Sequence, residues 1–200
     1  MCNDLTSKRP HQRLDLGPVL RDDIWKKCLV LDLDETLVHS SLSPIENPDM
    51  TIPVHIEGTI HNVYVAKRPR VDKFLAEMSK HYEIVVFTAS LREYADVLLD
   101  RLDFNRVIRH RLYREHCTRC GDEFLKDIGA LGRNLSDIVL VDDSEAPHSL
   151  YPENGIRCRA FTGDKRDREL DSIRNFLSEI AIVQDVREQL PLWTMKQNMR

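Results

Sequence analysis

Along most of the chain, segments of continuous apolar residues alternate with segments in which apolar residues recur at helical spacing. Continuous apolar runs predict buried strands over residues 27–33, 83–88 and 136–141. Apolar residues at helical spacing predict helices over residues 70–82, 91–102 and 165–182. Shorter apolar segments predict strands over 107–113 and near 156–161, and one more helix is expected beyond residue 183. Strands that alternate with helices predict an α/β fold with a parallel sheet and right-handed crossovers.

The segment between residues 40 and 68 shows a different pattern. Its apolar residues alternate with polar ones around a turn at Glu57–Gly58, which predicts a small antiparallel hairpin inserted over about residues 41–67. Residues 1–23 are polar, contain proline and glycine, and are expected to form a flexible N-terminal arm. Residues 24–200 are expected to form a single domain, because a chain of 200 residues can bury one good hydrophobic core.

The composition is ordinary for a globular protein, with 42% hydrophobic residues, 31% charged residues and a net charge of -4. This balance is too acidic for a dedicated nucleic-acid binder, so no direct nucleic-acid partner is expected. No apolar run approaches the roughly 20 residues of a membrane helix, so no membrane span is expected. The five cysteines are an odd number without a dense framework, which favours reduced thiols and an intracellular location, in the nucleus or the cytoplasm.

Residues with useful chemistry follow three of the predicted strands. Asp32 and Asp34 end the first strand, Thr88 and Ser90 end the second, and Asp142 and Asp143 end the third. Ligands of an open parallel sheet bind outside the carboxyl ends of its strands. If these strands are neighbours, up to four carboxylates meet, and two unit charges about 4 Å apart repel by about 4 kcal/mol at an effective dielectric near 20. Such a cluster needs a cation, and Mg2+ fits because it binds carboxylates, waters and phosphate oxygens.

The spacing of the first two acids indicates how they can share a reaction. Asp32 and Asp34 point the same way in an extended segment and can flank one substrate atom. One can attack phosphorus and form an aspartyl phosphate, while the other protonates the leaving oxygen and then activates water. A phosphate approaching acids also needs a lysine, and Lys126 is the candidate. Taken alone, the acids fit turn or capping residues, and Lys126 fits a surface lysine.

Five motifs occur in a recognisable order: DLDETLVHSS, KRPRVDKFL, VVFTAS, RE…FLKD and VLVDDS. They resemble the motifs of haloacid dehalogenase (HAD)-type phosphatases, and most of all those of the RNA polymerase II C-terminal-domain small phosphatases and the related Dullard phosphatases. The resemblance covers roughly residues 27–190. It implies a HAD-like (Rossmannoid) parallel sheet flanked by helices, with a small antiparallel insert after the first strand. It also implies a Mg2+-dependent protein serine/threonine phosphatase.

The resemblance assigns roles to individual residues. Asp32 would be the nucleophile, Asp34 the general acid and base, and Thr88 and Lys126 the phosphate ligands. Asp32, the backbone carbonyl of Asp34 and Asp143 would hold Mg2+. Asp142 would support them. The positions that match substrate-binding residues are Leu42, Val54, Ile56, Val63, Tyr94 and Arg114.

Two positions depart from the family pattern. Asp143 stands where the small phosphatases usually carry Asn, and Leu42 stands where the family tends to have an aromatic residue. The implied partner is a phosphorylated protein or peptide, with the RNA polymerase II C-terminal tail as one candidate. The run Lys67–Arg70 is interpreted as charge that faces the substrate. The alternative function is a catalytically weak scaffold or binding module of the same fold, which the retained catalytic acids and lysine argue against.

Overall fold

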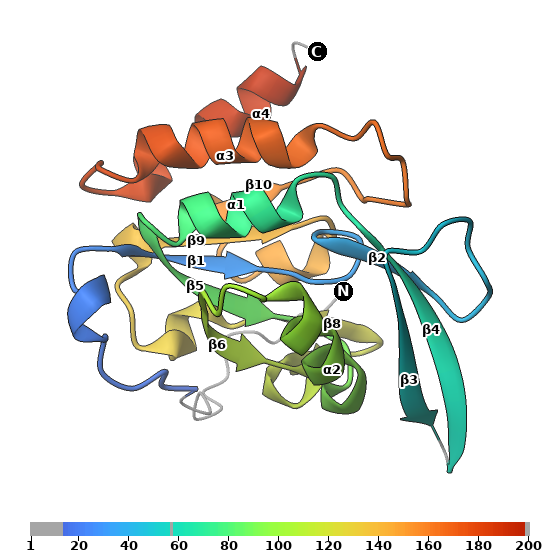
Figure 1. Cartoon of the computed structure of the whole chain (residues 1–200). Coiled ribbons are helices and arrows are strands. Elements are labelled where there is room, and N and C mark those ends of the chain that lie inside the picture. Colours follow the sequence, from blue (N-terminus) through green and yellow to red (C-terminus); the bar gives the residue numbers. More distant parts are fainter. Residues whose placement is uncertain (1–13, 57, 199–200) are drawn as a thin grey trace.

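The computed structural model describes residues 14–56 and 58–198, and its centre is a five-stranded sheet (Figure 1). The strands are β1 (Lys27–Leu31), β5 (Tyr82–Phe87), β6 (Ile108–Leu112), β9 (Ile138–Asp142) and β10 (Gly155–Arg157). Their order is β10-β9-β1-β5-β6, and every pairing is parallel. The predicted α/β fold is confirmed. The strands β9, β1 and β5 are neighbours, so the acidic and hydroxyl residues at their carboxyl ends can meet at one edge of the sheet.

The strands of the sheet bury apolar side chains on both faces. On one face, Leu29 and Leu31 belong to the larger core cluster, to which all four α-helices contribute. These helices are α1 (Val71–Met78), α2 (Arg92–Leu102), α3 (Glu169–Ile180) and α4 (Pro191–Asn198). On the other face, Cys28 and Val30 belong to a smaller cluster, which is covered by a 3-10 helix (Ile128–Leu131) and by residues of the N-terminal segment. Irregular chain therefore covers much of this second face.

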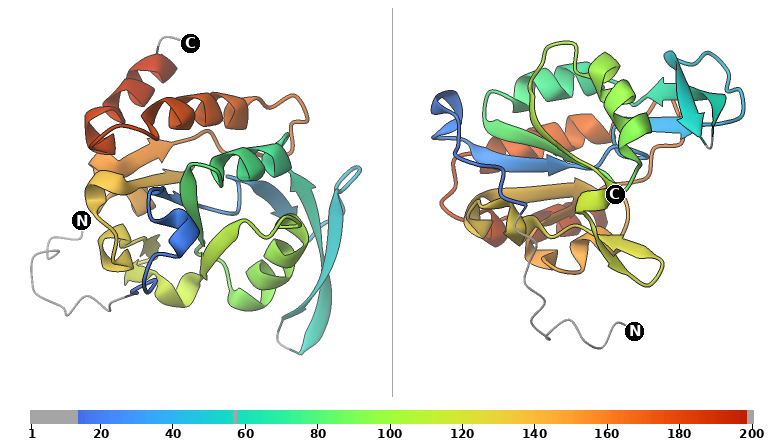
Figure 2. Two further views of the ribbon diagram at one scale, coloured as in Figure 1. Left: turned by 60° about the vertical axis from the view of Figure 1, so that its left-hand side comes forward. Right: turned by 90° about the horizontal axis from the view of Figure 1, so that it is seen from below.

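Short 3-10 helices connect several of these elements. They span Arg21–Asp23, Arg114–His116, Ile128–Leu131, Leu135–Asp137, Ala146–His148, Pro152–Asn154 and Val186–Glu188. Helices α1 and α3 lie side by side and both contribute to the larger core cluster on one face of the sheet (Figures 1 and 2). The helix α1 buries Val71, Phe74, Leu75 and Met78, which recur at helical spacing on one side.

The inserted segment forms a three-stranded antiparallel sheet. Its strands are β2 (Val38–Ser41), β3 (Met50–Ile56) and β4 (Thr59–Lys67), in the order β2-β4-β3. The predicted hairpin corresponds to β3 and β4, and β2 adds a third strand. Figure 1 shows this inserted sheet at the end of the molecule toward which β1 points, and Figure 2 shows β3 and β4 projecting from the body of the protein. A separate two-stranded ribbon consists of β7 (Thr118–Cys120) and β8 (Glu123–Leu125).

Part of the predicted N-terminal arm lies against the domain. Leu14 and Leu16 pack on the smaller core cluster. Asp23 is fully buried and pairs with Lys26 at 2.6 Å and Arg109 at 2.8 Å. Residues 14–23 are thus attached to the fold by apolar and ionic contacts. Residues 1–13 lie outside the described residues, and the domain boundary at residue 23 stays a prediction.

The expectation that the Lys67–Arg70 run faces the substrate is wrong for Arg68. Its side chain is 0% exposed. Nε and Nη2 each donate to one carboxylate oxygen of Asp167 at 2.9 Å, and Nη1 donates to the carbonyl oxygen of Thr36 at 3.0 Å. Arg68 therefore ties the loop before α3 to the turn after β1, because its planar guanidinium can reach several acceptors at once.

The state of the cysteines differs in part from the expectation drawn from composition. Cys28, Cys117 and Cys158 are free thiols, whereas Cys120 is disulfide-bonded, contrary to the expectation that the cysteines are reduced. Cys117 and Cys120 are therefore not bonded to each other. Within the described ranges, no helix has the length and apolar character needed to cross a membrane.

Candidate active site

Neighbouring strands bring the predicted chemistry to one edge of the sheet. Leu31, the last residue of β1, pairs with Val141 of β9. Asp32 and Asp142 follow these two residues directly, so both acids leave the sheet at the same level. The N–H of Asp32 also donates to the carbonyl oxygen of Val141 at 2.9 Å. Thr88 follows the adjacent strand β5, and the three side chains therefore converge.

A crevice of about 510 Å3 opens at this edge. Its lining includes all six residues that were predicted to take part in catalysis, to bind phosphate or metal, or to support these residues: Asp32, Asp34, Thr88, Lys126, Asp142 and Asp143. Arg114 and Phe124 also line it. The chain segments that meet here are far apart in the sequence, so the parallel sheet is what assembles them.

Lys126 lies between two of the acids. Its Nζ donates to Oδ1 of Asp32 at 2.6 Å and to Oδ2 of Asp142 at 2.5 Å. The lysine is only 1% exposed. Burial disfavours its charge, but the two carboxylates outweigh this effect, and the pKa of Lys126 lies above its ordinary value. Lys126 is therefore a fixed cation at the base of the crevice.

Asp32 is strongly affected by its surroundings. Burial raises the pKa of Asp32 to about 7, Lys126 opposes this rise, and the charges of Asp142 and Asp34 add to it. Additional positive charge in the crevice would favour the ionised carboxylate, which is the form that can attack an electrophile.

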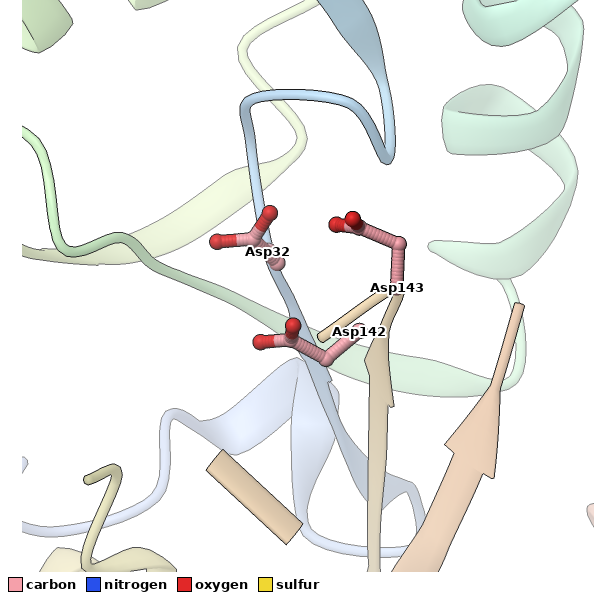
Figure 3. Close-up of side chains that lie close together, drawn as sticks. All are labelled: Asp32, Asp142 and Asp143. Atoms are coloured by element: carbon pink, nitrogen blue, oxygen red, sulfur yellow. The ribbon is translucent and has the colours of Figure 1, made fainter. Parts of the chain in front are cut away.

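Asp32, Asp142 and Asp143 form an acidic cluster. Each offers one carboxylate oxygen, and these oxygens lie within 4.8 Å of one another. Figure 3 shows the carboxylates of Asp32 and Asp143 facing each other, with Asp142 beside them. The donors are hard oxygen atoms that carry negative charge, so these residues fit Mg2+.

Hydrogen bonds distinguish the two acids at the end of β9. Asp142 uses both oxygens within the protein: Oδ2 accepts from Lys126, and Oδ1 accepts from the N–H of Ser144 at 3.0 Å. Oδ1 of Asp143 accepts from Oγ1 of Thr36 at 3.1 Å. Burial, followed by the charge of Asp142, raises the pKa of Asp143. Asp142 is therefore held by Lys126 and Ser144, whereas Asp143 accepts from Thr36.

Two hydroxyl groups orient the carboxylate of Asp34. Ser90 donates to Oδ2 and Tyr94 donates to Oδ1, each at 2.7 Å. The Tyr94 oxygen also lies 2.5 Å from Oγ of Ser40. Burial, followed by the charge of Asp34, raises the pKa of Tyr94, so its hydroxyl keeps its proton at neutral pH. Asp34 is thus held by neutral donors, whereas Asp32 is held by Lys126.

Thr88 and Arg114 lie in the wall of the crevice. Oγ1 of Thr88 accepts from the N–H of Ser90 at 3.0 Å, so its own O–H can be directed at a bound anion. Nε of Arg114 donates to the carbonyl oxygen of Ala89 at 2.6 Å, and its guanidinium carbon lies 5.1 Å from the ring centroid of Phe124. These positions are compatible with the predictions that Thr88 binds phosphate and that Arg114 contacts the substrate.

Among the predicted substrate-binding residues whose side chains the structure describes, Leu42, Val54, Val63 and Tyr94 do not line the crevice. Leu42 is 62% exposed, whereas Val54 and Val63 are 4% and 6% exposed and belong to the larger core cluster. The side chain of Ile56 lies outside the described residues. Tyr94 is engaged with Asp34. A substrate pocket on the inserted sheet therefore stays a prediction.

Ser90, which the sequence places with Thr88 at the end of a strand, lines the crevice. Two other hydroxyl residues at the site, Thr36 and Ser40, were not assigned to it from the sequence. Thr36 lies two residues beyond Asp34 in a strand-end loop, and the alternation of side chains could have indicated it. Ser40 offered no such signal, because its contact with Tyr94 joins residues 54 positions apart.

Known proteins resemble this chain in sequence and in fold. A family model described as NLI interacting factor-like phosphatase matches residues 27–187. The chain is 50% identical over 170 residues to "Probable C-terminal domain small phosphatase" of Dictyostelium discoideum, covering 85% of this chain and 56% of that protein. It is 47% identical over 168 residues to the human "CTD small phosphatase-like protein", covering 84% and 61%. The chain thus spans somewhat more than half the length of these relatives.

The fold resembles that of a solved structure described as "The Structure of Fcp1, an essential RNA polymerase II CTD phosphatase". The TM-score is 0.66 with 16% sequence identity, covering 78% of this chain and 62% of that chain. At this level of identity the likeness concerns the fold alone.

Proposed function

This chain belongs to the NLI interacting factor-like phosphatase family, and we propose that it is a Mg2+-dependent phosphatase that removes phosphate from serine or threonine in proteins. The family and the HAD-like fold predicted from the sequence are confirmed. The observation that most directly supports the activity is the bridge from Lys126 to Asp32 and Asp142, in a crevice that also contains Asp34.

The first step transfers the phosphoryl group to Asp32. A carboxylate oxygen attacks phosphorus, the bond from phosphorus to the serine or threonine oxygen breaks, and an aspartyl phosphate forms. Asp34 gives a proton to the departing oxygen, which leaves as a neutral alcohol. Thr88 and Lys126 bind the other phosphate oxygens, and Lys126 offsets charge that the buried acids would otherwise repel.

The second step releases phosphate. Asp34, now ionised, takes a proton from water as the water oxygen attacks phosphorus. The bond from phosphorus to Asp32 breaks, which restores the carboxylate and frees inorganic phosphate. The two acids therefore return to their starting states after each cycle, and no other reactant is needed.

The residues that would hold Mg2+ are Asp32, Asp143 and the backbone carbonyl of Asp34. The carboxylates of Asp32 and Asp143 belong to the clustered acids, and the carbonyl is proposed from the resemblance alone. When bound, the ion supplies positive charge that offsets the acids and polarises the phosphoryl oxygens.

The proposed partner is a phosphorylated protein or peptide. The names of the Dictyostelium and human relatives refer to C-terminal-domain phosphatases, which makes the RNA polymerase II C-terminal tail one candidate substrate. We place this activity inside the cell, in the nucleus or the cytoplasm. Arg114, which lines the crevice, is the candidate contact for a negatively charged substrate.

Release of inorganic phosphate from a phosphoserine peptide tests the proposal, with and without Mg2+. Wild type is expected to release phosphate only with the ion, and Asp32→Asn is expected to be inactive while remaining folded. Asp22→Asn, which changes an exposed aspartate elsewhere in the chain, is the matched control and should retain activity. Absence of release by wild type under both conditions would favour the scaffold alternative, and normal release by Asp32→Asn would remove Asp32 from its role.

A further inference from the structure

The two carboxylate oxygens of Asp34 have different surroundings. Oδ2 accepts from Ser90, which lines the crevice. Oδ1 accepts from Tyr94 on α2, and Tyr94 does not belong to the crevice lining. Oδ2 therefore lies on the crevice side of Asp34, and Oδ1 is held by Tyr94 outside the crevice lining.

The number of hydrogens on each group determines the donor and acceptor in the hydrogen bonds between Ser40, Tyr94 and Asp34. A tyrosine hydroxyl has one hydrogen, and an ionised carboxylate can only accept. Because Tyr94 donates its hydrogen to Asp34, the 2.5 Å contact between Ser40 and Tyr94 requires Ser40 to be the donor. The hydrogen bonds thus run from Ser40 to Tyr94 and from Tyr94 to Oδ1 of Asp34.

We propose that Ser40 and Tyr94 form a hydroxyl relay that fixes Oδ1 of Asp34 and reserves Oδ2 for proton exchange with the substrate. The inference rests on the proposed phosphatase function. A neutral carboxyl group carries its hydrogen on one oxygen, and the Tyr94 donor occupies Oδ1. The Ser90 hydroxyl can turn from donor to acceptor when Oδ2 becomes protonated. Ser40 and Tyr94 act through Asp34, so both are positioning residues.

The relay also connects the inserted sheet to the acid. Ser40 lies on β2, where it pairs with Val65 of β4. Val65 is 0% exposed and belongs to the same core cluster as Leu98 and Leu99 of α2, the helix that carries Tyr94. Arg101 of α2 also donates to the carbonyl oxygen of Thr51 on β3 at 2.7 Å, so the inserted sheet packs directly against α2. This packing gives the insert a role in orienting Asp34, separate from any contact that it makes with a substrate.

Phenyl phosphate and p-nitrophenyl phosphate test the relay, because they share a ring but differ in how much their leaving oxygen needs a proton. With Tyr94→Phe, kcat/KM for phenyl phosphate is expected to fall about 100-fold, and that for p-nitrophenyl phosphate only about threefold. Ser40→Ala is expected to give the same selectivity with a smaller loss, about tenfold for phenyl phosphate. Tyr64→Phe and Ser41→Ala, on β4 and β2, are matched controls and should leave both values unchanged.

Equal losses on the two substrates would show that Tyr94 only contacts the substrate, and would overturn the relay. The same selectivity in either control variant would also overturn it. A crystal structure of Tyr94→Phe gives a readout that does not depend on activity: the Asp34 carboxylate is expected to rotate, and an unmoved carboxylate would contradict the inference. If wild type releases phosphate from neither these compounds nor the phosphoserine peptide, the proposed function fails, and the crystal structure alone decides the relay.

Discussion

Nζ of Lys126 lies 2.6 Å from Oδ1 of Asp32, so the candidate nucleophile is paired with a cation that is itself 1% exposed. The same ammonium group reaches Asp142, and Asp143 adds a further acid to the cluster. The buried acids therefore outnumber the lysine that contacts them. This excess of negative charge explains why the crevice suits a divalent cation. Substitutions that change this charge are therefore expected to alter the stability of the protein and its affinity for Mg2+.

Lys126→Met is expected to destabilise the metal-free protein by about 3 kcal/mol at pH 8, because Asp32 and Asp142 would face each other without a cation. Urea unfolding with and without Mg2+ measures this, and Mg2+ should restore part of the loss. Lys73→Met, which removes a lysine that is 61% exposed, should cost less than about 1 kcal/mol. Equal losses for the two variants would contradict a structural role for the Lys126 bridge.

Asp143→Asn is expected to weaken Mg2+ binding about tenfold while raising the stability of the metal-free protein, because it removes one repelling charge. Isothermal titration calorimetry with Mg2+ measures the first effect, and thermal unfolding without metal measures the second. Glu145→Gln changes an acid that lines the crevice but lies outside the acidic cluster, and it serves as the control. Unchanged affinity in Asp143→Asn would place the ion elsewhere.

Glu83 is expected to make stability depend on acid pH. Burial alone would raise its pKa, but hydrogen bonds from Arg133 and His110 outweigh burial and lower the pKa of Glu83 from 4.5 to about 2. A lowered pKa stabilises the fold above pH 4.5, and this stabilisation, about 3 kcal/mol, is lost as the pH falls toward 2.

Urea unfolding of wild type and Glu83→Gln across this pH range measures the effect. Wild type should be the more stable of the two at pH 7, and the difference should shrink steadily between pH 4.5 and 2. A difference that stays constant with pH would show that titration of Glu83 does not contribute.

Arg68→Lys is expected to lower the free energy of unfolding by about 2–3 kcal/mol, because lysine cannot reproduce the paired hydrogen bonds to Asp167 in a buried position. Arg70→Lys provides a control in the same motif: Arg70 pairs with Asp171, its side chain is 48% exposed, and the expected change is below about 1 kcal/mol. Chemical denaturation compares the two variants. Similar losses at both positions would show that the buried hydrogen bonds of Arg68 add little to the free energy of unfolding.

The sequence predicted the central sheet and the meeting of the strand-end residues at one edge of it, because both depend on local patterns. Apolar runs identified the strands. Asp32 and Thr88 follow β1 and β5, Asp142 ends β9, and these strands pair side by side. The approach of Lys126 to Asp32 was expected only through chemistry and resemblance, since 94 residues separate them in the chain.

Long-range contacts account for what the sequence did not reveal. Arg68 was expected to face the substrate, and only its approach to Asp167, 99 residues away, explains its burial. The relay from Ser40 through Tyr94 likewise requires β2 to pack beside α2. The third strand of the inserted sheet was missed because β2 is short and ends in two serines, so it shows little apolar alternation.

Trapping a covalent phosphoenzyme tests the central claim most directly. Wild type is mixed with a phosphoserine peptide and Mg2+, quenched during turnover, and reduced with borohydride, which converts an aspartyl phosphate to homoserine. Mass spectrometry should then find homoserine at position 32 in wild type and not in Asp32→Asn. Phosphate release by wild type with no modification at Asp32, or with the modification at another aspartate, would contradict the mechanism.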